Sequence, residues 1–160
     1  MSTTKSIDDL TAGEVMKTEP ITAEPWMTAR QFAQMLEEEE ISGAPVVDQQ
    51  GHLVGIASRG DLIHQSISLN NDNDLDFIFE SLKEENDEDE VPVISHEREL
   101  HVEDFMVEDP ITVTPDVPIR SVAAKMIESR VHRVVIVEGK IPVGIITSLD
   151  LARLVAEGAQ

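Results

Sequence analysis

Near its C-terminal end the chain reads Gly144-Ile145-Ile146-Thr147-Ser148-Leu149-Asp150. An apolar run typical of a short strand ends at a hydroxyl residue, and three positions later an aspartate stands at the start of a helical pattern. A related copy runs Gly55-Ile56-Ala57-Ser58-Arg59-Gly60-Asp61. The sequence therefore predicts the same strand-to-helix turn twice.

Such a turn has a chemical use. The first N–H groups of a helix lack intrahelical partners and, with the helix dipole, favour an anion such as phosphate. The Asp150 carboxylate could accept hydrogen bonds from two neighbouring ribose hydroxyls while Thr147 faces a phosphate. The alternative is that Thr147 and Ser58 cap their helices and the aspartates suit the first turn. One copy alone favours capping, whereas the repetition favours a ligand.

Composition limits the class of protein. The chain has 160 residues, enough for one domain or two small ones sharing a core, and its 41% hydrophobic content indicates a globular fold. A formal charge of -20 argues against nucleic acid or an anionic membrane as partner. No cysteine is available for a disulfide, a thiolate nucleophile or a thiolate metal site. No secretion signal or membrane span is seen, so a soluble cytoplasmic protein is expected.

The two turns belong to a longer internal duplication. Met16-x-x-x-Pro20-Ile21-Thr22 returns ninety residues later as Met106-x-x-x-Pro110-Ile111-Thr112, and Pro25 returns as Pro115. Both openings predict a turn followed by a short extended segment. The methionines are interpreted as core filler.

Each opening is followed by the same series of elements. Thr28 is the expected N-cap of a helix whose buried face carries Ala29, Phe32, Ala33 and Leu36. In the second copy Pro118 is expected just inside the helix start, with Ile119, Val122, Ala123 and Met126 on the apolar face. Strands are predicted at 44–47, 53–57, 134–137 and 143–147, with Pro142 at a strand beginning or edge. Closing helices start at the two aspartates, so the unit strand-helix-strand-strand-helix is made twice.

An acidic insertion separates the copies. Its segment 72–76 resembles the start of a calcium loop, but Phe77 and Lys83 stand where that loop needs glycine and glutamate. We interpret 75–82 as a small helix or lid and 84–90 as a solvated linker.

The ordered, doubled pattern closely resembles tandem cystathionine-beta-synthase (CBS) domains, the pair often called a Bateman module. The resemblance implies an α/β (α+β) fold of two pseudo-twofold repeats, with their sheets packed against each other and clefts between them. Repeat 1 would span 10–66, the insertion 67–100 and repeat 2 101–157. In that family the clefts commonly bind AMP, ADP, ATP or S-adenosylmethionine. Such modules are usually non-catalytic and often dimeric.

Site residues follow from the resemblance by position. Asp61 and Asp150 would take ribose hydroxyls, Ser58 and Thr147 would lie near ribose or phosphate, and Thr22 and Thr112 would border the adenine. The pair His132-Arg133 is similar to the His-Arg pairs that reach phosphates in the gamma subunit of AMP-activated protein kinase. Taken alone, this pair is equally consistent with an exposed strand start.

The first copy has Ser42-Gly43-Ala44 where the second has His132-Arg133-Val134. We therefore expect one good site and one weak or empty site, without knowing which cleft holds the good one. Arg59 could compensate in the first copy. Lone Trp26, where the second copy has Asp116, is expected to pack or to anchor a dimer or partner.

The resulting hypothesis is a non-catalytic regulatory module that binds an adenosine-containing ligand, forms a homodimer and signals to an unidentified protein. The alternative is a ligand-free interaction or scaffold protein. An enzymatic role has little support, because the histidines lack paired metal-ligand spacing and no nucleophile elbow or phosphate-binding loop occurs.

Overall fold

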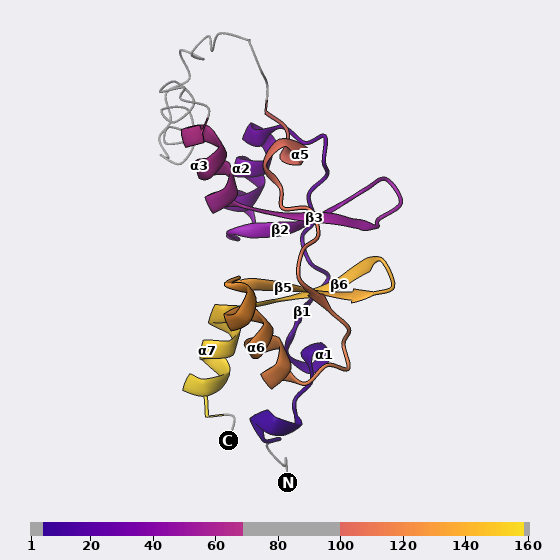
Figure 1. Cartoon of the computed structure of the whole chain (residues 1–160), viewed down its shortest axis with the longest axis vertical. Coiled ribbons are helices and arrows are strands. Elements are labelled where there is room, and N and C mark those ends of the chain that lie inside the picture. The colour runs from indigo at the N-terminus through magenta and orange to yellow at the C-terminus, as the bar shows by residue number, and fades with distance from the viewer. Residues whose placement is uncertain (1–4, 69–99, 159–160) are drawn as a thin grey trace. The chain divides into compact units, whose positions relative to one another are not determined.

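The computed structural model describes residues 5–68 and 100–158. The segment at which a calcium loop was considered and rejected, the small helix or lid, and the solvated linker all lie outside the described residues. Helices and strands follow in the order η1 (Ile7–Asp9), α1 (Ala12–Val15), β1 (Lys17–Thr18), α2 (Ala29–Glu38), β2 (Gly43–Val47), β3 (Leu53–Ser58), α3 (Arg59–Ser68), α5 (Val102–Phe105), β4 (Thr112–Val113), α6 (Ile119–Ser129), β5 (Arg133–Glu138), β6 (Ile141–Thr147) and α7 (Ser148–Ala156) (Figure 1).

Two compact units are built from these elements, and each takes segments from both halves of the chain. Unit 1 consists of Met1–Pro20, Gln50–Leu53 and Asp109–Gln160. Unit 2 consists of Ile21–Gln49 and Val54–Glu108. The opening segment of each repeat thus belongs to the unit formed by the rest of the other repeat.

In unit 1 a four-stranded sheet has the order β1-β6-β5-β4. β1 and β5 run antiparallel to β6, and β4 runs parallel to β5. α1, α6 and α7 lie on one side of this sheet (Figure 1). The core between them is formed by the following buried residues: Ala12, Val113, Ile119, Val122, Met126, Val134, Ile136 and Ile146.

In unit 2 the strands β2 and β3 form a two-stranded sheet. Ala23 extends it through a parallel bridge to Val46, where Ala23 N–H donates to the Pro45 carbonyl at 2.8 Å. α2, α3 and α5 lie on one side of the sheet (Figure 1). The Phe32 and Phe105 rings meet in its core at 5.5 Å between centroids.

The elements predicted from periodicity are confirmed. All four long strands form within two residues of the predicted ends, whereas α3 and α7 begin at Arg59 and Ser148, two residues before the predicted starts at Asp61 and Asp150. Thr28 caps α2, since its hydroxyl accepts from Gln31 N–H at 3.1 Å. Pro142 is the second residue of β6. Pro118 differs by one position, because it is the N-cap of α6 in extended backbone.

Met16 and Met106 do more than fill a core. Met16 packs onto Gly144 in β6, and Met106 packs onto Gly55 in β3, so that a side chain at either glycine would meet methionine atoms at less than van der Waals distance. The same methionine–glycine contact is therefore made twice, each time between opposite halves of the chain. The glycines provide room for a segment from the opposite half of the chain.

Four short elements were not predicted, namely η1, α1, β1 and α5. α1 begins at a capping box in which the Glu14 carboxylate accepts Thr11 N–H at 3.0 Å, and α5 begins where Asp104 accepts His101 N–H at 2.8 Å. β1 pairs with β6 through Lys17 and Thr18. The Thr11-x-x-Glu14 spacing is a capping signal that could have revealed α1.

Candidate functional site

The turn before α7 is a reciprocal cap. Thr147 N–H donates to Asp150 Oδ2 at 2.8 Å, and Asp150 N–H donates to Thr147 Oγ1 at 3.2 Å. Both bonds satisfy donors at a helix start that would otherwise be unpaired. The capping alternative raised by the sequence is therefore confirmed for this turn.

The turn before α3 repeats this geometry. Ser58 N–H and Ser58 Oγ both donate to Asp61 Oδ2, at 2.9 and 2.8 Å, and Asp61 N–H donates to Ser58 Oγ at 3.2 Å. Capping does not consume either carboxylate, because an ionised carboxylate has two acceptor oxygens and the cap uses one.

The next amide of each helix is also bonded within the protein. Ser148 N–H donates to the His132 carbonyl at 2.9 Å, and Arg59 N–H donates to the Ser42 carbonyl at 3.0 Å. These helix starts therefore offer an anion fewer free N–H groups than the sequence pattern suggested. The remaining capacity for a polar ligand lies mainly in side chains.

The Asp150 side chain can still accept hydrogen bonds from a ligand through Oδ1. It is the buried acidic residue of the described chain, with 9% of its surface exposed. Its Oδ1 atom lies 3.8 Å from Lys17 Nζ and 4.0 Å from Arg153 NH1. Lys17 belongs to β1, so the N-terminal segment brings a cation to the aspartate of the last helix.

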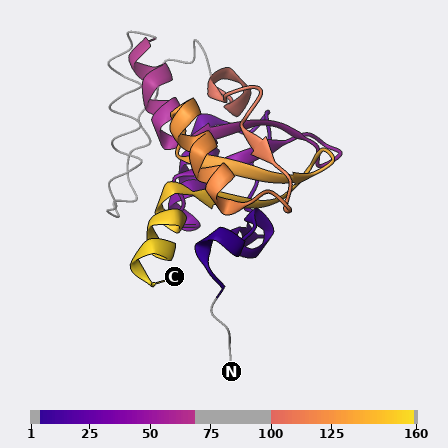
Figure 2. The ribbon, with the colours of Figure 1, turned by 60° about the horizontal axis from the view of Figure 1, so that its bottom comes forward.

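An open pocket of about 260 Å³ lies at Asp150. The N-terminal segment and α7 form its walls, and Figure 2 shows the two side by side. We call this pocket the α7 groove; its lining residues are Leu10, Glu14, Val15, Lys17, Asp150, Arg153, Leu154 and Glu157. The hydrogen bond from Lys5, together with that from Thr11 N–H, holds the pKa of Glu14 below its ordinary value. Of the residues in this groove, sequence reasoning identified only Asp150 as functional.

Sheet register brings three predicted residues to one face of unit 1. Arg133 is the cross-strand partner of Thr147, and Thr112 is the partner of Val135. Arg133 and Val135 are two apart on β5, so their side chains lie on the same face. The neighbouring Val134 lies in the helix-covered core, which places Thr112, Arg133 and Thr147 on the opposite face.

His132 precedes β5 and is exposed. Its Nδ1 atom lies 3.5 Å from Ser148 Oγ, so a polar pair stands at the start of α7. Ser148 was not singled out from the sequence, although it sits inside the Thr-x-x-Asp turn.

The candidate residues thus fall into two groups. Thr112, His132, Arg133, Thr147 and Asp150 belong to unit 1, and Thr22, Ser58 and Asp61 belong to unit 2. The unit 2 group has glycine, Gly43, at the strand position where unit 1 has Arg133. Trp26, also in unit 2, is 46% exposed.

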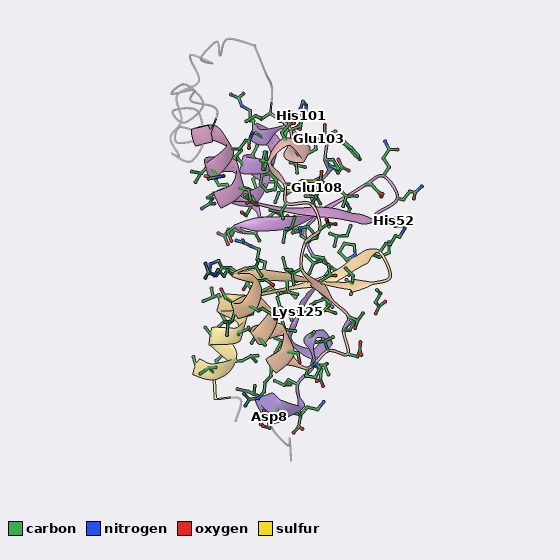
Figure 3. All side chains as sticks on the ribbon, viewed as in Figure 1. Asp8, His52, His101, Glu103, Glu108 and Lys125 are labelled. Carbon is green, nitrogen blue, oxygen red and sulfur yellow. The ribbon has the colours of Figure 1, made fainter. Side chains whose placement is uncertain are left out.

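Within residues 5–68 and 100–158 no cluster of three metal-binding side chains is present. Figure 3 shows His101 near Glu103 at α5, and His101 Nδ1 lies 3.9 Å from Asp104 Oδ2. None of the helices in the described part of the chain has the length and apolar character needed to span a bilayer.

Comparison with known proteins defines the family. The model of the CBS domain family matches residues 12–68 and again residues 102–157. The chain therefore belongs to the CBS domain family and carries two CBS repeats in a mixed α/β fold.

Individual relatives agree. The uncharacterized protein MJ1426 of Methanocaldococcus jannaschii is 34% identical over 125 residues, covering 70% of this chain and 71% of that protein. The CBS domain of a CBS domain containing membrane protein from Sphaerobacter thermophilus is 26% identical, with a TM-score of 0.67 and coverage of 92% and 89% of the two chains. The CBS domain pair of protein MJ0100, solved with 5′-methylthioadenosine and S-adenosyl-L-methionine, is 26% identical, with a TM-score of 0.68 and coverage of 91% and 98%.

Proposed function

We propose that this protein is a non-catalytic regulatory module that binds an adenosine-containing ligand through Asp150 and passes the binding event to a partner protein. The observation that carries the proposal is that the two oxygens of the Asp150 carboxylate have different contacts. Oδ2 is held by the Thr147 cap, which fixes the side chain, and Oδ1 lies beside two cations at a pocket. A fixed acceptor suits the paired hydroxyls of ribose.

The family supports the choice of adenosine. The CBS domain pair of MJ0100 was solved with two ligands that both contain adenosine. If an adenosine ligand binds as the resemblance to CBS domain pairs implies, Thr147 and Ser148 would lie near its ribose or 5′ substituent. Thr112 would lie near its adenine. His132 and Arg133 would meet a phosphate if the ligand is AMP, ADP or ATP.

We propose that unit 1 provides the stronger site. Asp150 is buried and lines a pocket, and Arg133 and His132 belong to the same unit. In unit 2 the corresponding group of Thr22, Ser58 and Asp61 has no cation at the strand start. Ligand binding would then alter a partner's activity only by its differential affinity for two states of the module.

Isothermal titration calorimetry with AMP, ADP, ATP and S-adenosylmethionine tests this proposal. Asp150→Asn keeps an oxygen for the Thr147 cap but removes the charge, so we expect normal folding and at least a tenfold loss of affinity. Asp61→Asn is the matched control in unit 2 and should reduce affinity less. If none of the four ligands binds the wild-type protein, the scaffold function becomes the better explanation.

We also propose a homodimer. On unit 1, Ile127 of α6 and Leu149 and Val155 of α7 are apolar side chains that are 79%, 60% and 73% exposed. Burying them against a second copy would remove apolar area from water. Sedimentation equilibrium should show a dimer for the wild-type chain and a monomer for Leu149→Glu/Val155→Glu. A wild-type monomer at micromolar concentration would contradict this assembly.

A further inference from the structure

The charges of the α7 groove form an ordered series along one helix face. Asp150, Arg153, Leu154 and Glu157 are spaced i, i+3, i+4 and i+7, so they lie on the same side of α7. Leu10 and Val15 from the N-terminal segment are half-buried opposite them. The groove is therefore lined by both charged and apolar side chains.

Two of its three carboxylates already have partners. Glu14 binds the Lys5 ammonium and Thr11 N–H, and Asp150 holds Thr147 N–H and faces the two cations. Glu157 follows the last residue of α7 and has no ion-pair partner in the described part of the chain. A cation at Glu157 would also be favoured by the negative end of the α7 dipole.

Lys17 and Arg153 form the positive part of the groove. Both approach Asp150 Oδ1, but at 3.8 and 4.0 Å, and their side chains are 64% and 56% exposed. Such exposed contacts are weak, so both cations can turn to a ligand at little cost. Arg153 and Glu157 are one helical turn apart, with Cβ atoms roughly 5–6 Å from each other.

These charges exclude some ligand groups and favour another. With Glu14 paired to Lys5, the remaining carboxylates of Asp150 and Glu157 balance the cations Lys17 and Arg153, and such a balance does not favour a polyphosphate. A purely apolar group would desolvate charges without replacing their hydrogen bonds. An α-amino acid carries an ammonium and a carboxylate on one carbon, which matches a cation and an anion one turn apart. The volume of about 260 Å³ also suits a group of that size.

We propose that the α7 groove binds an α-amino acid group, with its carboxylate between Lys17 and Arg153, its ammonium at Glu157 and its side chain over Leu10, Val15 and Leu154. The amino acid could be free or could be the amino-acid end of an S-adenosyl ligand. The second source rests on the proposed function, because Asp150 would then hold the attached ribose.

Calorimetry with three probes separates these sources. S-adenosylhomocysteine has both the adenosine and the amino-acid end, 5′-methylthioadenosine lacks the amino-acid end, and L-methionine lacks the adenosine. We expect the wild-type protein to bind S-adenosylhomocysteine at least tenfold tighter than 5′-methylthioadenosine. The Lys17→Met/Arg153→Met variant should lose this difference while its affinity for 5′-methylthioadenosine stays the same.

Lys125→Met is the control variant, because Lys125 lies on α6 (Figure 3) and does not line the groove, so its loss changes the net charge without removing a groove residue. It should keep the tenfold preference. Binding of L-methionine that is lost in Lys17→Met/Arg153→Met would also support the groove, with a free amino acid as its ligand.

Other outcomes would overturn the proposal. Equal affinity for S-adenosylhomocysteine and 5′-methylthioadenosine without methionine binding removes the amino-acid site and leaves the adenosine site intact. A preference that survives in Lys17→Met/Arg153→Met places the amino-acid end elsewhere. If methionine binds but no adenosine compound does, the groove stands and the proposed function fails.

Discussion

Met16 shows how a single side chain ties distant parts of the sequence together. It covers Gly144, where an added Cβ atom would lie 2.7 Å from Met16 Cγ. At Gly55 the same atom would lie 2.9 Å from both Met106 Sδ and the Val107 carbonyl oxygen. In both strands glycine is needed for close approach and not for an unusual backbone angle.

Gly144→Ala should therefore lower the free energy of unfolding by about 1–3 kcal/mol, because the new methyl group overpacks the contact with Met16. Combining it with Met16→Ala makes room for the methyl group, so the double variant should lose less than the sum of the single losses, by roughly 0.5–3 kcal/mol. Urea denaturation of the four proteins measures this coupling.

The control is Gly55→Ala with Met16→Ala. Gly55 is approached by Met106 and Val107, so these two changes share no contact and their effects should add. Strict additivity for Gly144 and Met16 as well would show that the methionine does not determine the need for glycine.

The side-chain contacts that could be predicted from the sequence join residues close together in the chain. Thr147 and Asp150 are three residues apart, so their cap could be anticipated from spacing alone. Lys17 could not be connected to Asp150, because that contact depends on β1 pairing with β6. The assignment of ribose, adenine and phosphate roles stays a prediction.

The ends of α2 and α6 share a strained feature. Glu40 and Arg130 follow these helices, and both have positive φ, 54° and 55°. The residue after each of them is hydrogen-bonded to the preceding helix: Ile41 N–H donates to the Leu36 carbonyl, and Val131 N–H donates to the Met126 carbonyl. This is the bonding of a left-handed helix terminus, in which glycine is the preferred residue.

Arg130→Gly should raise the free energy of unfolding by about 0.5–1 kcal/mol. Glycine removes a left-handed penalty of roughly 1–2 kcal/mol, and its greater unfolded-state entropy offsets part of that gain. Thermal unfolding followed by circular dichroism measures the change. Arg130→Ala should bring no such gain, because alanine keeps the penalty; an equal gain from both would mean that loss of the arginine side chain is the cause.

Elements with several turns or alternations were predictable, and the shortest ones were not. α2 and α6 show the apolar period of a helix over ten or more residues, and β2, β3, β5 and β6 show apolar runs bounded by turns. β1 and β4 have two residues each, too few for any period; the extended segment at β4 was predicted from its flanking prolines, whereas β1 was not predicted. Their existence depends on the edges of a sheet made by residues far along the chain.

Both units draw on both halves of the chain. The ninety-residue repeat predicts two similar bodies, but similarity between repeats contains no information on which opening segment packs with which sheet. The structure shows an exchange, in which residues 1–20 belong with 109–160 and the segment up to Glu108 belongs with residues 21–49. Hydrophobic patterns are the same for either pairing, which is why the sequence could not distinguish them.

Residues 1–68 and 100–160, produced as separate chains, should therefore bind each other. Each fragment lacks an opening segment that its own sheet needs, such as Met16 for Gly144. Mixing should increase ordered secondary structure in circular dichroism and give one complex in size-exclusion chromatography. Two fragments that fold fully and stay apart would contradict the exchange. Gly144→Ala in the second fragment should weaken the complex.

The antiparallel pair formed by Lys17 with Ile145 also sets the order in which the protein can be completed on the ribosome. Lys17 is made well before its strand partner Ile145, which is added only after every element between them has been made. Until then Leu10, Val15 and Met16 cannot reach their final packing in unit 1. Pairings of such large sequence separation slow folding, so the nascent chain carries an unpacked apolar segment until β6 has been made.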